Sequence, residues 1–404
     1  MDTRLTRRSV LKTGAIGLTA FLLPSAIGRR VHAAGSNPVL VAIFQRGAAD
    51  GLTTCVPTFD PFYYSSRPNV QVPPGTELAL GTTGFGLYAA FAPLLPIFDA
   101  GDLALIHACG SPDPSRSHFD AQDFMDRAAP GNKSITDGWL NRWLAIAGSG
   151  EPIQGVSLRT SKAKSMLGPA SSIAFESIAE FAMEGDSVAE RRDALETRYS
   201  LLPGTILGGS VTDAFSAVDL VASVDTTTSV VYPAGELGPV LQDAAALIKA
   251  DIGIKVIAID IGGWDHHSAQ LAAMDGVGGQ LAASLAAFWT DLGACQSSTL
   301  TLAMTEFGRR VGENGALGSD HGHGGVMWAL GGGLTGGRVV LKDDQWPGLA
   351  PANLFGGQDL AVTTDFRDVF AEALSVHMGT SLAQLAPVFP NFTASQANLP
   401  GLYT

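Results

Sequence analysis

The sequence predicts an α/β fold built around a mostly parallel sheet. Mainly apolar runs rich in β-branched residues, which are typical of buried strands, lie at Pro38–Phe44, Asp102–Cys109, Ile254–Ile261 and Ser298–Thr305. Helical segments lie between them, such as the Ala- and Leu-rich stretch Gln270–Phe288. This alternation of strand and helix indicates parallel strands joined by right-handed crossovers.

The N-terminal segment, residues 1–34, has the layout of a cleaved export signal. A basic segment with paired arginines, Thr6–Lys12, precedes an apolar stretch over Thr13–Gly28, and a small-residue site follows at Val31–Ala34. This pattern predicts that the twin-arginine machinery exports the folded protein to the periplasm or the medium. The alternative is a short membrane anchor, but a spanning helix needs roughly 20 apolar residues. We expect residues 35–404 to form a single mature domain with no integral membrane segment.

Charge and cysteine content narrow the class of protein. Removing the signal's six basic residues and one acid from the 25 basic and 38 acidic residues of the chain leaves a net charge of −18. Such a surface argues against nucleic acids and anionic membranes as partners. Cys55, Cys109 and Cys295 are too few for a disulfide framework. Free thiols are expected, and one bridge between Cys55 and Cys109 is the alternative.

Polar residues follow the first predicted strand. Arg46 and Asp50 lie just beyond Phe44, where ligand sites collect in open α/β sheets. Asp50 followed by glycine is equally consistent with a simple turn. The aromatic and Pro-rich segment Asp60–Thr83 is predicted to be surface structure, and Leu87–Ala100 to be a helix packed on the sheet.

A helix is predicted to begin at His118, shortly after the second strand. Ser117 suits the N-cap of this helix, and Asp120 suits the acid of a capping box. The functional interpretation uses the same geometry, because a hydroxyl at a helix N-terminus lies in positive potential beside free N–H groups that bind anions. Such a serine can attack a phosphate or sulfate ester.

Further helices complete the predicted fold. Asp137–Ala147 is amphipathic and carries two tryptophans that suit core packing. Residues 152–251 are predicted to form a helical insertion or cap over the sheet. Short strands are expected at Val326–Leu330 and Arg338–Leu341, and a helix at Phe366–Met378. The helices expected within the insertion are Ser187–Ser200, Thr212–Ser223 and Gly238–Lys249.

Acid and imidazole side chains cluster after the third and fourth predicted strands. Asp265 and His267 follow the pair Gly262–Gly263, and Glu306 begins the Gly-rich stretch Glu306–Gly325 after the fourth strand. Carboxylates and imidazoles at this spacing suit a divalent cation, and glycines let the backbone approach a ligand. The same stretch also contains Arg309, Asp320, His321 and His323.

The ordered motifs resemble one known family. R-G-A-A-D-G, R-S-H-F-D-A-Q, G-G-W-D-H-H, T-E-F-G-R, S-D-H-G-H-G-G and T-T-D-F-R-D-V are similar to those of the secreted domain of unknown function 1501 family, which is grouped with the alkaline-phosphatase and sulfatase superfamily. The resemblance implies a doubly wound sheet with helices on both faces. It also implies a site for one or two divalent ions (Zn, Mn or Ca) at the carboxyl ends of the strands.

The resemblance also implies site residues. Asp265 and His267 match an acid and a histidine that bind one metal, although the superfamily separates them by more residues. Phe307 replaces the histidine of an Asp-His pair, so His321 or His323 is expected to supply that imidazole. Asp320 is expected to bind metal or to orient an imidazole. The predicted metal ligands are Asp50, Asp265, His267, Glu306, Asp320, His321 and His323.

The predicted function is hydrolysis of a small or polymeric phosphate or sulfate ester by an exported, metal-dependent enzyme. Ser117 or a metal-bound water is the expected nucleophile, and His118 is expected to move protons. A formylglycine sulfatase is not expected, because Pro112 occupies the reactive position of that motif. The alternative is a non-catalytic envelope binding or scaffold protein with a structural or vestigial metal site. The arginines expected to bind the anionic substrate are Arg46, Arg116 and Arg309.

Overall fold

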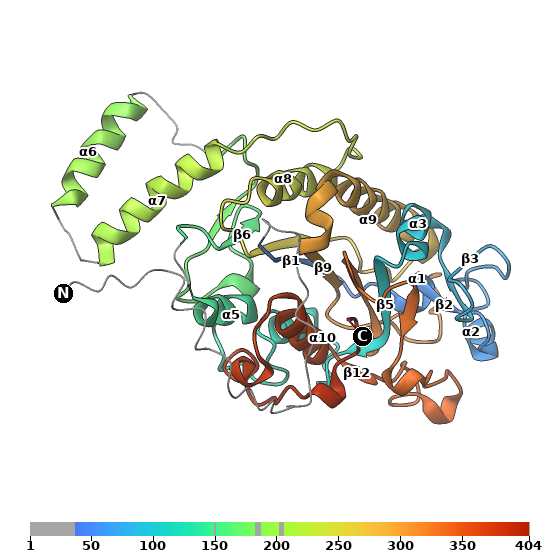
Figure 1. Ribbon diagram of the computed structural model, residues 1–404. Helices are drawn as coiled ribbons and strands as arrows, with labels where there is room; N and C mark the ends of the chain where they lie inside the picture. The colour runs from blue at the N-terminus through green and yellow to red at the C-terminus, as the bar shows by residue number, and fades with distance from the viewer. Residues whose placement is uncertain (1–36, 149–150, 182–186, 202–205, 404) are drawn as a thin grey trace, which may run out of the picture. The chain divides into compact units, whose positions relative to one another are not determined.

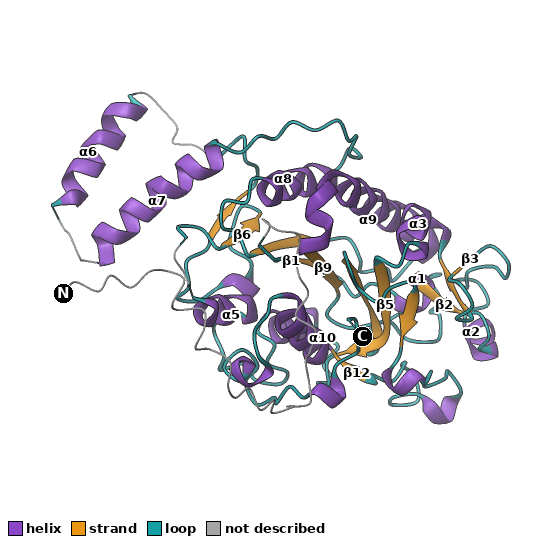
Figure 2. Ribbon diagram, in the orientation of Figure 1, coloured by secondary structure: helices purple, strands orange, loops and turns teal. Residues whose placement is uncertain are grey.

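The computed structural model of the protein describes residues 37–148, 151–181, 187–201 and 206–403. The predicted signal, residues 1–34, lies outside the described residues. The described part has the predicted α/β fold, with a mixed, mostly parallel main sheet and helices on both of its faces (Figures 1 and 2).

The main sheet has its first strand near the centre. β1 pairs in parallel with β8 on one side and with β9 on the other. The strand order is β11-β5-β10-β9-β1-β8-β6-β7, and β12 also pairs with β5. The strands are β1 Val39–Gln45, β5 Leu103–Gly110, β6 Gly155–Leu158, β7 Ile173–Phe175, β8 Val256–Ile261, β9 Thr299–Met304, β10 Gly325–Gly331, β11 Arg338–Val340 and β12 Thr364–Asp365.

The strands that matter most for function agree with the apolar runs in the sequence. β1, β5, β8 and β9 lie where buried strands were predicted, and almost all their residues are buried. β10 is antiparallel to both β9 and β5, because the chain reverses in the loop that precedes it. β5 therefore runs parallel to β9. The carboxyl ends of β1, β5, β8 and β9 all lie at one edge of the sheet.

Helices cover both faces of the sheet, each over its own hydrophobic core. α8 and α9 pack on the face that includes Val41 and Ile257, and α5 and α10 pack on the face that includes Leu40 and Ala258 (Figures 1 and 2). The helices are α1 Gly51–Thr54, α2 Pro61–Ser66, α3 Leu95–Asp99, α4 His118–Asp126, α5 Trp139–Ala147, α6 Val188–Ser200, α7 Ile206–Ala222, α8 Leu237–Lys249, α9 Gln270–Leu292 and α10 Phe366–Glu372. A π-helical turn, Ala373–His377, continues α10, and 3₁₀ turns lie at Ala89–Leu94, Lys164–Met166, Gly293–Ser298, Lys342–Asp344, Pro351–Asn353, Leu382–Leu385 and Gln396–Asn398.

The structure differs from the sequence prediction in three segments. The segment Asp60–Thr83 contains α2 and contributes to a small sheet in the order β2-β4-β3. The predicted helix Leu87–Ala100 is a 3₁₀ turn followed by the short α3, because its prolines interrupt regular helical hydrogen bonding. Residues 152–251 contain the predicted helices, but β6 and β7 also extend the main sheet. The strands of the small sheet are β2 Cys55–Pro57, β3 Leu78–Ala79 and β4 Phe85–Leu87.

The three cysteines are free, as expected. Cys55 belongs to the core beneath α8 and α9, whereas Cys109 belongs to the core beneath α5 and α10. The two thiols lie in the cores on opposite faces of the sheet, so the alternative of a bridge between them is wrong.

One helical stretch of the described residues, Gln270–Ser298, is long and apolar enough to cross a membrane as judged by length and composition alone. Its most apolar window has a mean hydropathy of 1.2, and 44 % of that window is buried inside the protein. Leu281, Leu285 and Phe288 of this stretch pack in the core against the sheet. The stretch thus has the packing of a core helix, which passes the same test. The expected absence of a membrane segment stays a prediction.

Candidate metal centre

Side chains from separate strand ends meet at the carboxyl edge of the sheet. Asp265 and His267 follow β8, His118 begins α4 after β5, and His321 lies in the loop between β9 and β10. That loop folds back on itself, so that Arg309 bridges to His321. A Cβ on Gly308 would lie 1.9 Å from the carbonyl oxygen of Gly324, so only glycine fits at position 308.

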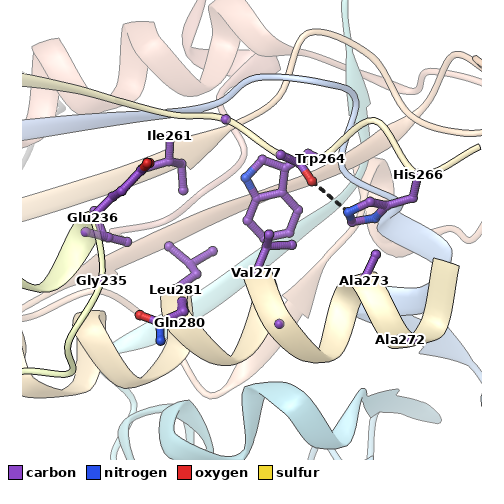
Figure 3. A pocket seen from close by; sticks show the side chains of 14 residues that line it. Gly235, Glu236, Ile261, Trp264, His266, Ala272, Ala273, Val277, Gln280 and Leu281 are labelled. Atoms are coloured by element: carbon purple, nitrogen blue, oxygen red, sulfur yellow. Dashed lines mark hydrogen bonds between the residues drawn. The ribbon is translucent and has the colours of Figure 1, made fainter. Parts of the chain in front are cut away.

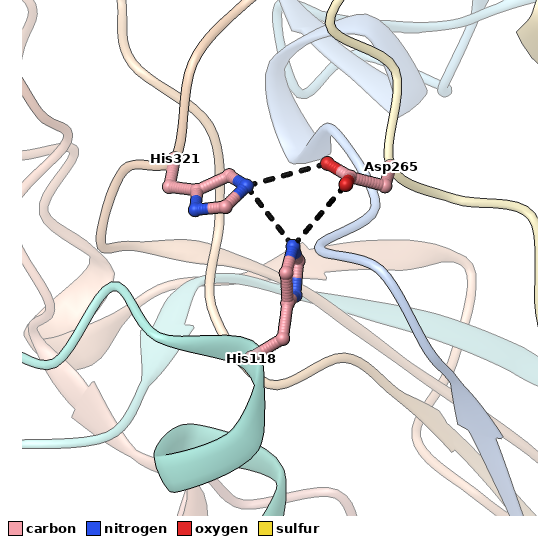
Figure 4. A group of neighbouring side chains, drawn as sticks. All are labelled: His118, Asp265 and His321. Carbon is pink, nitrogen blue, oxygen red and sulfur yellow. Dashed lines mark hydrogen bonds and ion pairs between the residues drawn. The ribbon is translucent and has the colours of Figure 1, made fainter.

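Three imidazole Nε2 atoms and one carboxylate converge at this edge. His321 Nε2 lies 3.0 Å from His118 Nε2 and 2.9 Å from His267 Nε2. Asp265 Oδ1 lies 3.0 Å from His267 Nε2 and 3.3 Å from His321 Nε2, and its Oδ2 lies 3.4 Å from His118 Nε2. Figure 4 shows His118, Asp265 and His321 pointing toward one another. One ligand atom from each of His118, Asp265 and His321 lies within 4.8 Å of the other two, and His267 adjoins this group through His321 and Asp265. We call these four residues the metal cluster.

The other ring nitrogen of each histidine has an oxygen partner. His118 Nδ1 lies 2.7 Å from Glu306 Oε1, His267 Nδ1 lies 3.2 Å from Asp320 Oδ1, and His321 Nδ1 lies 2.8 Å from the carbonyl oxygen of Arg116. Carboxylate and carbonyl oxygens only accept hydrogen bonds, so each Nδ1 must carry the proton. Each Nε2 of the neutral imidazoles then presents a lone pair to the others.

This arrangement fits a divalent cation. Lone pairs that face each other at 2.9 to 3.0 Å repel unless a cation or a proton lies between them. Histidines that bind metals usually donate their second N–H to a carboxylate or carbonyl, as all three histidines do here. The four residues of the cluster are half-buried or exposed, with side-chain exposures of 23 % to 46 %, so an ion can reach them.

Glu306 orients His118 from a fully buried position. Its Oε1 also accepts hydrogen bonds from the backbone N–H of Gly47 at 2.9 Å and from Gln122 at 2.8 Å. Burial alone would raise the pKa of Glu306, but the hydrogen bonds from His118 and Gln122 hold that pKa below its usual value. The hydrogen bond to Glu306 in turn raises the pKa of His118. Glu306 is therefore an ionised partner of His118.

Arg309 fixes the position of Asp265. Its side chain is fully buried, and it donates to Asp265 Oδ1 at 2.6 Å and to backbone carbonyls of Gly47, Ala48 and Ser319. Burial opposes ionisation of Asp265, but the hydrogen bond and charge of Arg309 outweigh burial and lower the pKa to about 2. The sequence predicted that Arg309 binds the anionic substrate. Its guanidinium is instead buried against Asp265 and backbone carbonyls, so it does not reach a substrate.

Asp50 lies in a buried ion pair. Its carboxylate pairs with the fully buried Arg67 and accepts hydrogen bonds from Thr53, Gln270 and the backbone of Leu52. Burial would raise the pKa of Asp50, but Arg67 and the hydrogen bonds lower it. Protein donors occupy both carboxylate oxygens, in contrast to the open carboxylate expected of a metal ligand.

The remaining predicted residues surround the cluster. Asp320 accepts a hydrogen bond from His267 Nδ1, which is the contact expected of a residue that orients an imidazole. The ring of His323 stacks on Phe355 at 4.3 Å between centroids, and burial lowers the pKa of His323. Arg116 pairs with the buried Asp359, and Arg46 pairs with Asp126 and Asp260. The structure therefore brings His321 into the cluster, and it places His323 against Phe355 instead.

Ser117 is the N-cap residue of α4, as predicted, but its side chain makes no capping hydrogen bond. The predicted capping box with Asp120 is also absent, because Asp120 pairs with Lys133 at 2.7 Å. Ser117 is exposed and adjoins His118 of the metal cluster. The structural explanation for this serine is therefore weaker than the sequence indicated.

Sequence reasoning missed three parts of the site. It assigned His118 to proton transfer, whereas the geometry places its Nε2 among the cluster nitrogens. The sequence could have indicated this role, because His118 follows a predicted strand that ends at the same edge of the sheet. Nothing in the sequence indicated the roles of Gln122 and Arg67. Gln122 bonds Glu306 and Arg67 bonds Asp50, and in each case the two residues lie in segments that share no motif.

The chain is distantly similar to several solved structures. The C-terminal periplasmic domain of EcEptC from Escherichia coli is 9 % identical over 89 % of both chains, with a TM-score of 0.37. A complex of that domain with Zn is 8 % identical over 74 % of both chains, with a TM-score of 0.33. Alkaline phosphatase from the Antarctic bacterium TAB5 is 10 % identical over 74 % of this chain and 93 % of that one, with a TM-score of 0.29. Similarities at this level transfer no residue roles.

Comparison with protein families gives a direct result. No curated protein matches the sequence. One family model, described as "Protein of unknown function (DUF1501)", matches residues 107–385, which include His118, Asp265, His267 and His321. The match agrees with the resemblance of the sequence motifs. The chain belongs to the DUF1501 family of proteins of unknown function.

Proposed function

We propose that the protein is a metal-dependent hydrolase of phosphate or sulfate esters, with one divalent cation held by His118, Asp265, His267 and His321. The convergence of three imidazole Nε2 atoms on one carboxylate supports this proposal most strongly. Imidazole-rich sites favour Zn²⁺ over Ca²⁺, which prefers oxygen ligands. When bound, the cation polarises an ester oxygen and lowers the pKa of a nearby hydroxyl.

The number of ions in this proposal follows from the contacts of Asp50 and Arg309. Asp50 is occupied by Arg67, and the buried guanidinium of Arg309 supplies a fixed positive charge 2.6 Å from Asp265. A permanent cation beside the cluster favours the binding of an anionic group, because charges interact strongly away from bulk water. We therefore propose a single metal ion, with the positive charge of Arg309 in the place of a second ion.

Ser117 is the proposed nucleophile, with a water molecule as the alternative. The hydroxyl is exposed at the first turn of α4, makes no capping hydrogen bond and is adjacent in sequence to His118. The free N–H groups of that turn favour an anionic group near the hydroxyl. Of the three arginines predicted to bind the anionic substrate, Arg116 is half-exposed, although it pairs with Asp359. It is therefore the arginine proposed to contact the anion.

The Ser117→Ala variant tests this function. It should lose hydrolysis of 4-nitrophenyl phosphate or 4-nitrocatechol sulfate and keep its bound metal. Its free energy of unfolding should change by less than about 0.5 kcal/mol, because no cap is lost. Metal analysis, turnover and urea unfolding are measured on the wild type, on Ser117→Ala and on the neighbouring control Ser115→Ala.

The outcomes of this experiment separate the alternatives. Turnover that persists in Ser117→Ala assigns the attack to water. A metal-loaded wild type without turnover on any phosphate monoester, phosphate diester or sulfate ester favours the non-catalytic binding protein. A wild type that holds no metal contradicts the proposed site.

We also propose that the protein is exported folded by the twin-arginine pathway to the periplasm or the medium. The paired Arg7 and Arg8, the apolar stretch and the small-residue site support this proposal. The intact mass of the exported protein should begin after Ala33 or Ala34, and the double change Arg7→Lys with Arg8→Lys should keep the protein in the cytoplasm. A full-length chain in the envelope fraction would contradict the proposed cleavage.

A further inference from the structure

The carboxyl end of β8 lies between a cavity and a charged network. On one face of the sheet, Ile261 lines a mainly apolar cavity of about 570 Å³ beside α9 (Figure 3). Side chains alternate between the two faces of a sheet, so Asp260 points to the opposite face. There its Oδ1 lies 2.9 Å from Arg46 Nη2. The network on this second face reaches the metal cluster through hydrogen bonds.

Arg46 is held in place by two acids and an aromatic ring. Its Nη2 group donates to Asp126 Oδ2 at 3.0 Å and to Asp260 Oδ1 at 2.9 Å. Its guanidinium carbon also lies 4.1 Å from the centroid of the Phe44 ring. Because a guanidinium is planar and its donors form a rigid fork, these contacts also fix the direction of the second amino group, Nη1.

The amide of Gln122 lies between Arg46 and Glu306. Arg46 Nη1 donates to Gln122 Oε1 at 3.2 Å, and Gln122 Nε2 donates to Glu306 Oε1 at 2.8 Å. A guanidinium has donors and no acceptor, so the amide oxygen must face Arg46. The amide nitrogen then faces Glu306. Arg46 thus fixes the orientation in which Gln122 presents a donor to the carboxylate.

Glu306 Oε1 accepts hydrogen bonds from three directions. The donors are the backbone N–H of Gly47 at 2.9 Å, Gln122 Nε2 at 2.8 Å and His118 Nδ1 at 2.7 Å. His118 Nε2, on the other side of the ring, lies 3.0 Å from His321 Nε2 in the metal cluster. The position of one oxygen therefore sets the direction of the His118 ring. We call Arg46, Gln122 and Glu306 the positioning chain.

We propose that Gln122 and Arg46 are positioning residues of the metal site, which hold Glu306 so that the His118 ring presents Nε2 to the divalent cation. Neither residue contacts the cation itself. Partners of this kind behind a metal-binding histidine affect affinity because they restrict the ring to one orientation. This inference rests on the proposed metal site and is independent of the ester that is hydrolysed.

The Gln122→Met variant tests the positioning chain. Methionine is similar in size but cannot donate to Glu306, so the variant should bind Zn²⁺ about tenfold more weakly than the wild type. Competition with a fluorescent chelator measures the affinity of the mature protein without any need for turnover. The matched control on the same helix is Asp120→Asn, because Asp120 pairs with Lys133 outside the chain, and it should bind Zn²⁺ as the wild type does. Urea unfolding of the metal-free proteins checks that both variants are folded.

A double-variant cycle shows whether Gln122 acts through Glu306. Glu306→Gln alone should lower the affinity for Zn²⁺ by about 10–100-fold. Adding Gln122→Met to Glu306→Gln should then change the affinity by less than about twofold, because the carboxylate that Gln122 positions is already gone. A general effect on the fold would instead add a further loss of about tenfold in this background, and that result would overturn the proposal.

The role of Arg46 is measured in the same way. Arg46→Met should weaken Zn²⁺ binding by at least about threefold, whereas Arg46→Lys, which keeps a cationic donor for Gln122, should restore most of it. Equal affinities in Arg46→Met and the wild type would remove Arg46 from the chain.

Two outcomes separate this inference from the proposed function. A wild type that binds Zn²⁺ and a Gln122→Met variant that binds it equally well would overturn the positioning chain alone. A wild type that binds no Zn²⁺ would overturn the chain together with the metal site.

Discussion

The His321→Ala variant is expected to lose the bound metal and all ester hydrolysis. His321 Nε2 lies within 3.3 Å of His118 Nε2, His267 Nε2 and Asp265 Oδ1, so its removal leaves the other three residues without their central partner. Removing a partner behind a metal ligand typically costs 10–100-fold in affinity, and removing the ligand itself should cost at least about 100-fold. Metal content after dialysis and turnover on a phosphate monoester are the measurements.

The control for this variant is His323→Ala. His323 lies in the same Gly-rich stretch and had an equal claim from the sequence, but its ring stacks on Phe355. We expect His323→Ala to keep one metal ion per chain. Equal metal loss in both variants would contradict the arrangement of the cluster, and so would full retention in His321→Ala.

Metal binding should also release protons and stabilise the wild type. Each Nδ1 already carries a proton, which it donates to an oxygen acceptor. In the metal-free protein, a second proton on one Nε2 is needed to separate two facing nitrogens. A histidine that carries both protons is a positively charged imidazolium. His118 is suited to this state, because Glu306 raises its pKa. Binding at neutral pH should therefore release about one proton. Metal at 100 times its Kd adds about 2.7 kcal/mol to the free energy of unfolding, and His321→Ala should lose that increment.

Apolar strand runs and strand-end polar residues were enough to predict which side chains gather at the carboxyl edge of the sheet. β1, β5, β8 and β9 are buried strands whose sequence signal is strong, and their shared edge follows from their parallel pairing. Asp265, His267 and His321 were identified in this way. Strand order and the antiparallel β10 could not be predicted, because they depend on packing between segments far apart in the chain.

The sequence could not distinguish the candidate metal ligands from residues that hold the surrounding loops together. Asp50 and Arg309 are of the residue types expected at a phosphoester site, and both follow strands at the correct edge. Their roles depend on burial and on partners such as Arg67, which comes from a segment without recognisable strand or helix periodicity. Similarly, only the path of the loop decides which of His321 and His323 joins the cluster. That path places Arg309 opposite His321.

The Arg67→Met variant is expected to destabilise the fold by about 3 to 5 kcal/mol, because it leaves the buried Asp50 without its cation. Both side chains are almost completely buried, at 0 % and 1 % exposure. Arg67 also donates to the carbonyl oxygens of Arg310 and Val311, at 2.7 Å and 2.8 Å, so it connects the loop after β1 to the loop after β9. Urea unfolding of the metal-free proteins measures the loss.

The pH dependence of that loss identifies its cause. In the wild type, the pKa of Asp50 is lowered by folding, so its contribution to stability is complete above the unfolded pKa, near 3.9, and is lost as pH falls through the folded value. In Arg67→Met, burial without a cation should raise that pKa. The deficit should therefore be largest at neutral pH and should shrink as pH falls and Asp50 is protonated.

The double variant Arg67→Met with Asp50→Asn separates the ion pair from the other contacts of these residues. The introduced asparagine side chain is uncharged and keeps an acceptor for the backbone of Leu52, so the double variant should be more stable at neutral pH than Arg67→Met alone. Asp50→Asn alone should keep its metal, because the metal cluster does not include Asp50. A loss below about 1 kcal/mol in Arg67→Met would match an exposed pair and contradict this account. Loss of metal from Asp50→Asn would instead return Asp50 to the ligands predicted from the sequence.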